Sequence, residues 1–485
     1  MSLKRYLANA DNTIANAFRN DNFNLRATGS NMGLADVLEV FSIYGRSTTS
    51  SAELSRVLVQ FDTSQISSDR TAGDIPASGS VSFYLRLFNA ETTKTVPQNF
   101  SLTIQAISRS WDEGYGLDLE GYKDKGKSNW VSASSTVGWT AAGGDYHASP
   151  SYTQTFTKGT EDLEVDITTL VEQWLTGSSG GGKANYGVGI RLGPTFEASS
   201  SSNPSGAVDS FYAKRFFARG TEFFFKRPVI EARWDSSKRD DRGDFYLSSA
   251  LAPASDNLNT LYLYNYVRGR LKNIPGVGTG SIFVNLHQTL GSSALTQAVV
   301  TPATGGFVST GIYSCSVCIT GTYSTLRDVW FKGSDQYFTG TISPKSFSAA
   351  SISQGRTKKY LNITNLKDSY TRDENARFNL YVRERDWSPT IYTVASTEVS
   401  TTIIESASFR LYREIDGLEI IPHATSSDLY TMLSHDVSGN YFNLDMSLLD
   451  GGYQYSFKFA FYDEERNAWD EQAEKFTFRV IDYEH

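Results

Sequence analysis

The chain has 485 residues, enough for two to four domains, and 13% of them are aromatic, with 27 Tyr and 29 Phe. Its formal net charge of -8 leaves no basic face that could neutralise a phosphate backbone, so nucleic-acid binding is disfavoured. No apolar window reaches the length of a membrane span, and the N-terminal residues lack the apolar run of a signal peptide. We therefore expect a protein that is made in the cytoplasm and has no membrane partner.

Short apolar runs alternate with clusters of Ser, Thr and Gly, which favours an all-β fold of tandem β-sandwiches. We expect the first domain at residues 1–236, as a sandwich of the jelly-roll kind. Its candidate strands are residues 13–19, 37–44, 56–61, 81–89, 100–107, 154–156, 163–166, 186–192, 210–217 and 228–234. In the third of these, Val57, Val59 and Phe61 recur every second residue, as expected for a strand with one buried face.

A long insertion at residues 115–144 follows the strand at 100–107. Loops of this length are either functional or packed down by their own side chains. Trp111, Trp130 and Trp139 favour the packed interpretation.

Two pairs of carboxylates lie in the same region, Asp112 with Glu113 and Asp118 with Glu120. Acid and nucleophile roles in glycan cleavage need two carboxyl groups facing each other across a cleft, and nothing in the sequence frames such a cleft. A surface loop is favoured over a Ca²⁺ or sugar contact, and both are favoured over catalysis.

A short helix is predicted to open after Asp166. Ile167, Leu170, Val171 and Trp174 would share one of its sides and cover the sheet.

The segment 213–228 holds five phenylalanines and five basic residues in sixteen positions. In one interpretation it is a strand pair whose rings enter the core. In the other it is an exposed interface for protein partners. The candidate interface residues are Arg215, Phe216, Phe217, Arg219, Phe223, Phe224 and Phe225.

A charged segment at residues 235–244 marks the end of the first domain, either as a solvated connector, which we favour, or as a docking surface; we expect none of it to anchor a core. Two immunoglobulin-like sandwiches are predicted after it, at residues 237–350 and 351–485. In the last one, Tyr455, Phe457, Phe459 and Phe461 alternate and would form a buried aromatic face. Cys315 and Cys318 lie on a predicted strand, which favours buried thiols over a redox pair.

The sequence offers no assembled catalytic set. The five histidines, His147, His287, His423, His435 and His485, show no metal-ligand spacing, and no Gly-x-Ser-x-Gly elbow occurs. Lys183, after the glycines at 180–182, is followed by Ala184 and not by Ser or Thr, so this is not a phosphate loop. We expect no enzyme, no cofactor and no bound metal.

Several motifs in residues 10–235 are similar to those of DNRLRE-type domains. They are the strand ending in Phe61-Asp62, the segment Ser110–Gly114, the helix at 166–174 and the strand Asn185–Ile190. The resemblance implies a non-catalytic β-sandwich module of the kind found in surface and carbohydrate-associated proteins.

Nearly the whole chain, and especially residues 1–18 and 224–234, resembles virion structural proteins of tailed phages that infect marine bacteria, cyanophages in particular. The resemblance implies a structural part of the neck, collar, baseplate, fibre attachment or head decoration, located in the virion after assembly in the host cytoplasm. Its partners would be other virion proteins, including copies of itself. The alternative is an adhesin that binds a host surface glycan through Trp111, Tyr115, Trp130 and Trp139.

Overall fold

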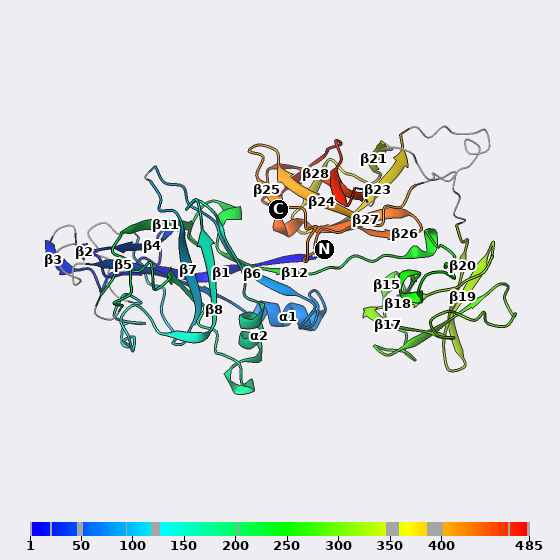
Figure 1. Cartoon of the computed structure of the whole chain (residues 1–485), viewed down its shortest axis with the longest axis horizontal. Helices are drawn as coiled ribbons and strands as arrows, with labels where there is room; N and C mark the ends of the chain where they lie inside the picture. The colour runs from blue at the N-terminus through cyan, green and yellow to red at the C-terminus, as the bar shows by residue number, and fades with distance from the viewer. Residues whose placement is uncertain are drawn as a thin grey trace. The chain divides into compact units, whose positions relative to one another are not determined.

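The computed structural model describes residues 2–19, 22–45, 52–93, 95–117, 127–200, 203–345, 358–385, 401–463 and 466–482. The chain divides into two compact units, Ser2–Trp234 and the residues from Asp235 onward. Most of the regular secondary structure in both units is β-strand (Figure 1), so the all-β prediction is confirmed. A further division of the second unit near residue 350 stays a prediction.

The first unit is organised around a long first strand, β1 (Leu3–Ala15). Its first half pairs with β12 and its second half with β5, and the register shifts between Ala8 and Ala10. An irregularity of this kind lets one strand pass from one sheet to another, so the strands curl around a shared core. Their order is β8-β7-β10-β5-β1-β12-β6-β9, and off this path β4 pairs with β5 and β11 pairs with β4. Their bounds are β4 (Val37–Ile43), β5 (Glu53–Phe61), β6 (Ser82–Leu87), β7 (Phe100–Ile107), β8 (Tyr146–Phe156), β9 (Leu163–Asp166), β10 (Val188–Leu192), β11 (Phe211–Phe217) and β12 (Val229–Arg233), with the short pair β2 (Phe18–Arg19) and β3 (Asn22–Arg26).

Strand β5 is buried on both faces. Val57, Val59 and Phe61 enter the main core, as predicted. On the opposite face Leu58 belongs to a second, smaller core that it shares with the tryptophans of the insertion. Trp130 and Trp139 therefore hold the described part of the insertion against the outer side of the sheet.

Two α-helices occur in the described part of the chain, α1 (Ser64–Ala72) and α2 (Thr168–Thr176). Helix α2 confirms the prediction, since Leu170, Val171 and Trp174 are its buried residues. Helix α1 has no apolar stripe that the sequence pattern could have revealed, because only Ile66 and Asp69 are buried. The guanidinium of Arg70 on α1 reaches Glu172 on α2 at 2.7 Å, which joins the two helices.

The predicted bounds of two strands were wrong. The first strand was expected at residues 13–19 but begins at Leu3, and β8 begins at Tyr146 instead of residue 154. Both strands carry polar residues at positions where a half-buried strand would show apolar ones, so the alternation signal is missing there.

The second unit begins with a six-stranded arrangement in the order β13-β18-β17-β16-β19-β20. Strand β17 pairs with β16 through residues 303–305 and with β18 through residues 306–309, so it links two sheets as β1 does in the first unit. The bounds are β13 (Asn259–Tyr264), β14 (Tyr266–Val267), β15 (Arg270–Leu271), β16 (Ile282–His287), β17 (Ala303–Ser309), β18 (Ile312–Val317), β19 (Leu326–Lys332) and β20 (Asp335–Ile342).

The last part of the unit is a sandwich of a four-stranded and a six-stranded sheet. Tyr455, Phe457, Phe459 and Phe461 are all buried, so the predicted aromatic face is confirmed. The ring of Phe378 lies 4.8 Å from that of Phe457. The strands are β21 (Lys359–Ile363), β22 (Ser369–Thr371), β23 (Asn375–Glu384), β24 (Ala407–Arg413), β25 (Glu419–Ile421), β26 (Ser434–Asp436), β27 (Gly439–Asp445), β28 (Gln454–Asp463), β29 (Ala468–Glu471) and β30 (Phe476–Ile481).

The charged segment 235–244 is not a solvated connector. Asp240 is buried, and the guanidinium of Arg242 holds both carboxylate oxygens of the fully buried Asp328 in β19, at 2.6 and 2.7 Å. Asp241 accepts a hydrogen bond from the Thr260 N–H at 2.6 Å and lies 3.2 Å from Nε2 of His435 in β26. The favoured interpretation was wrong because these polar side chains have fixed partners far away in the sequence.

Candidate functional site

Part of the phenylalanine-rich segment 213–228 lies in the core, and part of it lies at the surface. Phe216 lies in the main core, so it cannot be an interface residue. Arg215 and Arg219 are committed to ion pairs within the unit, with Glu39 at 2.5 Å and with Glu113 at 2.7 Å. Three of the seven predicted interface residues therefore have structural roles.

The other four predicted interface residues form what we call the phenylalanine surface: Phe217, Phe223, Phe224 and Phe225. Phe223 is 52% exposed, and the other three are half-buried. The rings of Phe217 and Phe223 meet edge to face with centroids 5.4 Å apart, and those of Phe224 and Phe225 do so at 5.1 Å. Aromatic rings grouped at a surface are typical of protein interfaces.

The described part of the tryptophan-bearing insertion is packed, as its sequence predicts. Trp111, Trp130 and Trp139 are at most 8% exposed, and the indole N–H groups of Trp111 and Trp139 each donate a hydrogen bond of 2.8 Å to a backbone carbonyl. These three rings therefore offer no face to a sugar, which corrects the glycan-contact prediction for them. Tyr115 is 74% exposed, and among the four predicted residues it alone has an accessible ring.

A buried polar cluster fastens this insertion to β1. Asp11 accepts the Arg219 backbone N–H at 2.5 Å, and its own N–H donates to Glu113 at 2.8 Å. The guanidinium of Arg219 holds both oxygens of Glu113, and Asn31 donates to the backbone carbonyls of Glu113 and Ser128. No local sequence pattern reveals this cluster, because Asp11 and Arg219 are 208 positions apart.

The two acidic groups of this cluster differ in their environments. Burial raises the pKa of Asp11 to about 7, a shift that the nearby Glu113 carboxylate reinforces and the Arg219 N–H opposes. Two neighbouring carboxyl groups could in principle serve as a catalytic acid and base. Here, however, Asp11 is buried, and both carboxylate oxygens of Glu113 are bound by Arg219. The arrangement holds the fold together and offers a substrate no approach to Asp11.

The remaining predicted carboxylates contribute no further site. Asp112 lies 3.5 Å from the Lys127 ammonium in a partly exposed ion pair. Asp118 and Glu120 lie outside the described residues.

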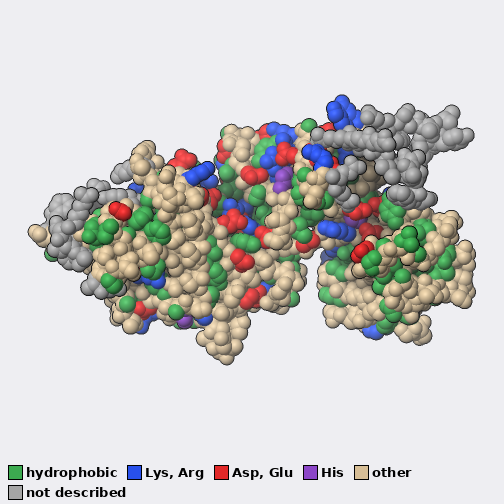
Figure 2. All heavy atoms as spheres, in the orientation of Figure 1, with side chains coloured by type: hydrophobic (Ala, Val, Ile, Leu, Met, Phe, Trp, Pro, Cys, Tyr) green, Lys and Arg blue, Asp and Glu red, His purple; other side chains and the backbone are tan. Residues whose placement is uncertain are grey.

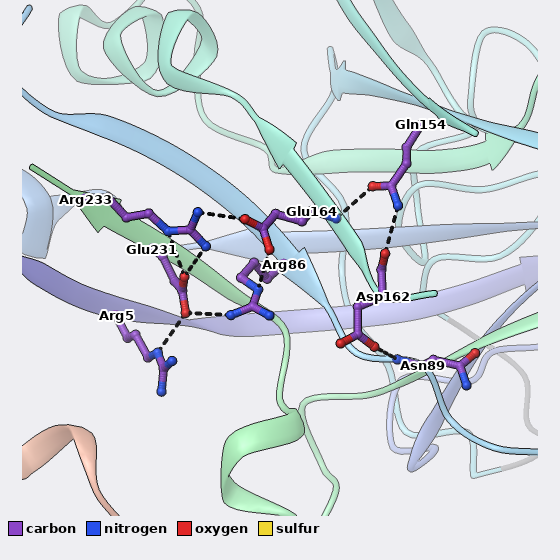
Figure 3. Close-up of polar contacts among 8 residues, drawn as sticks. All are labelled: Arg5, Arg86, Asn89, Gln154, Asp162, Glu164, Glu231 and Arg233. Carbon is purple, nitrogen blue, oxygen red and sulfur yellow. Dashed lines mark hydrogen bonds and ion pairs between the residues drawn. The ribbon is translucent and has the colours of Figure 1, made fainter. Parts of the chain in front are cut away.

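A network of Arg and Glu side chains lies on the outer face of the strands β1, β12, β6 and β9 (Figure 3). Glu231 on β12 is 1% exposed and accepts hydrogen bonds from three guanidinium groups, Arg5 at 2.9 Å, Arg86 at 3.2 Å and Arg233 at 2.7 Å. Glu164 on β9 accepts a second bond from Arg233 at 2.7 Å. Burial opposes ionisation, yet the three arginines lower the pKa of Glu231 to about 2.

A Ser, a His and a Glu side chain lie next to one another in the last sandwich. Ser408 Oγ lies 3.0 Å from Nδ1 of His423, whose Nε2 lies 3.6 Å from Glu471. Burial and the Arg410 charge lower the pKa of His423 to about 4, although Glu471 opposes this. Ser408 is fully buried beneath Thr431, whose hydroxyl lies 2.8 Å away, so a carbonyl substrate cannot reach its oxygen in this structure. No sequence motif reveals this arrangement, because Ser408 does not lie in a Gly-x-Ser-x-Gly elbow.

Other groups of chemical interest are enclosed. Cys315 and Cys318 are free, buried thiols, as predicted, and burial raises the pKa of Cys315 to about 12. Lys214 is buried, and its ammonium donates to Asn89 and to the carbonyls of Gly159 and Glu161.

Within the described part of the chain, no three His, Cys, Asp or Glu side chains are grouped to hold a metal ion. Among the helices of the described residues, none is long and apolar enough to cross a membrane. On the face shown in Figure 2, basic and acidic side chains are intermingled.

Comparisons with known proteins leave the family open. No protein-family model matches the sequence, and no curated protein does. Among solved structures, the adhesin InvE of Yersinia pseudotuberculosis shows 12% identity over 50% of this chain and 56% of its own, with a TM-score of 0.15. A chimeric titin Z1Z2 shows 12% identity over 47% of this chain and 90% of its own, also with a TM-score of 0.15. The resemblance to DNRLRE-type domains stays a prediction.

Proposed function

We propose that the chain is a non-enzymatic structural component of a tailed-phage particle, which binds neighbouring virion proteins through the phenylalanine surface. The observation that carries this proposal is the exposure of Phe223 beside Phe217, in a unit whose other described large aromatic rings mostly fill cores. Rings in this position gain free energy when a partner covers them. The proposed location in a phage particle rests on the resemblance of nearly the whole chain to virion structural proteins of tailed phages.

The chemistry of the surface indicates an apolar partner. Arg215 and Arg219 already have their charges balanced by Glu39 and Glu113, so contact there would depend on ring burial more than on ion pairs. The reactive groups described above support a non-enzymatic role. Asp11, Glu113 and Ser408 are each hydrogen-bonded to other residues of the chain.

The experiment is to introduce Phe223→Asp into the phage and measure how much of the chain purified particles carry, by quantitative mass spectrometry. A charge in the centre of an apolar contact costs at least about 1.4 kcal/mol, so incorporation should fall about tenfold or more. Tyr360→Asp is the matched control, since Tyr360 is also exposed, at 45%, but lies on β21 in the second unit. Unchanged incorporation of folded Phe223→Asp protein contradicts the proposed surface, and absence of the wild-type chain from particles contradicts the proposed function.

A further inference from the structure

Trp469 differs from the other tryptophans that the structure describes. Those six, in both units, are at most 8% exposed: Trp111, Trp130, Trp139, Trp174, Trp234 and Trp330. Trp469 is half-buried on β29, a strand that pairs with β28. Within the described part of the chain, its indole N–H has no hydrogen-bond acceptor. A tryptophan with an accessible ring and an uncommitted donor is suited to binding a ligand.

Tyr462 extends this aromatic surface. It lies directly opposite Trp469 in the strand pair, and the two ring centroids are 5.5 Å apart with the rings inclined at 59°. Both side chains are on the outer face of the sheet, because their neighbour Phe461 is buried on the inner face. The Tyr462 hydroxyl donates to Oδ1 of the exposed Asn467, which leaves the Asn467 amide as a donor at the rim of the rings.

Charged groups on the same face are balanced. Glu471, opposite Ala460, accepts hydrogen bonds from Lys458 at 2.9 Å and from Arg410 at 3.1 Å. Glu419 lies 3.5 Å from Arg410, so two cations face two carboxylates. A ligand that carries a net charge gains little here, whereas hydroxyl groups can both donate to Glu471 and accept from Lys458.

We propose that Trp469, Tyr462 and Asn467 form a binding site for a neutral hexopyranoside, as a free sugar or as a unit of a polysaccharide. The apolar C–H face of the sugar ring would lie on the two aromatic rings. Its hydroxyls would accept from the Trp469 indole and the Asn467 amide and donate to Glu471. This site goes beyond the proposed structural role and does not rest on it.

The test uses the full chain labelled with 5-fluorotryptophan, with Trp469→Phe to assign the ¹⁹F resonance of Trp469. The probes are methyl glucopyranoside, methyl galactopyranoside, methyl mannopyranoside and their oligomers, with glucuronate as the charged analogue and glycerol as the polyol control. At least one neutral pyranoside should shift the Trp469 resonance and leave the other tryptophan resonances unchanged. Tyr462→Ala should weaken that binding about tenfold, the effect of losing about 1.4 kcal/mol of aromatic contact.

Two further variants separate the site from general surface effects. Asn467→Gly removes the amide but suits the left-handed backbone at this position, where φ is +48°, so it should weaken binding while the fold is kept. Tyr360→Ala removes another exposed tyrosine and should leave binding unchanged. The proposal is overturned if no pyranoside or oligomer shifts the resonance, if glycerol shifts it equally, or if glucuronate binds more tightly than every neutral sugar.

Discussion

The first unit and the last sandwich bury different kinds of side chains. Among its described residues, the first unit buries six acidic or basic side chains: Asp11, Asp69, Glu197, Lys214, Glu231 and Arg233. Among the described residues of the last sandwich, none of the Lys, Arg, Asp and Glu side chains is buried, and its centre is a set of stacked phenylalanines. The same chain therefore stabilises its sheets in two ways, by directed polar bonds and by ring packing.

We attribute this difference to the insertion, which the first unit has to fix in place. The first unit carries a long insertion on the outer face of its sheet. Asp11, Glu113 and Arg219 fix the segment that leads into this insertion to β1. Directed bonds to charged groups fix geometry, but they make stability depend on ionisation. Ring packing depends on buried area and on shape.

The largest effect should come from the ring-packed core. Phe457→Ala removes a fully buried ring that contacts Phe378 and Phe442, and should lower the free energy of unfolding of the last sandwich by about 3–5 kcal/mol. The loss should be the same at low and high salt. Urea unfolding at two salt concentrations measures the loss and its salt dependence. A strongly salt-dependent loss would contradict the assignment of this core to ring packing.

The central carboxylate of the Arg–Glu network comes next. Glu231→Gln leaves three guanidinium groups around a neutral side chain and should cost about 3 kcal/mol, the low end for breaking a buried ion pair, because Arg5 and Arg86 keep some contact with water. The control is Glu419→Gln, which removes an exposed carboxylate beside Arg410 and should cost less than about 1 kcal/mol. Hydrogen exchange in β1, β6 and β12 reports the change. Equal effects of the two variants would remove the distinction between buried and surface charge.

A smaller effect, with a characteristic pH dependence, is expected at Asp11. Its pKa is raised from 3.8 to about 7, so the folded state holds this proton more tightly than the unfolded state does. The corresponding stabilisation is complete below about pH 4 and is lost as the pH rises through 7. Asp11→Asn, which resembles the protonated acid, should match the wild type near pH 4.

The same variant should exceed the wild type in stability at pH 8, by at least about 1.4 kcal/mol, the equivalent of one pKa unit. Asp74→Asn, a change at an exposed carboxylate, should show no such crossing. Hydrogen exchange of the paired β1 and β5 amides at the two pH values measures the effect. If Asp11→Asn is the less stable protein at pH 8, the ionised carboxylate belongs to the native cluster.

The smallest effect on stability is expected at the phenylalanine surface. Phe223→Ser should change the free energy of unfolding by no more than about 0.5 kcal/mol, as is usual for exposed positions. Thermal unfolding of the purified chain checks this. A loss of several kcal/mol would mean that Phe223 belongs to the first unit's core.

The sequence predicted those parts of the fold that depend on local periodicity. Val57, Val59 and Phe61 showed a buried strand face by their spacing, and Leu170, Val171 and Trp174 showed a helix face. Helix α1 and strand β17 were missed, because α1 is polar on most sides and β17 carries Gly305 and Gly306 in its middle.

Candidate sites were harder to predict, because they depend on contacts between distant residues. Trp130 identified a packed insertion, but nothing near Glu231 in the sequence shows that Arg5 and Arg86 converge on it. Asp11 lies in a segment that resembles a polar loop, and only the register of β1 places it beside the insertion. Trp469 carries no distinguishing sequence signal, since its exposure follows from its position on β29.

The central claim is that this chain acts through its surfaces and not through reactive side chains. The most direct measurement is a cryo-EM map of the purified phage particle, at a resolution that places side chains. We predict that the map contains the chain, with Phe217, Phe223, Phe224 and Phe225 covered by a neighbouring virion protein. A map in which these rings all face solvent, or particles that lack the chain, would contradict the account.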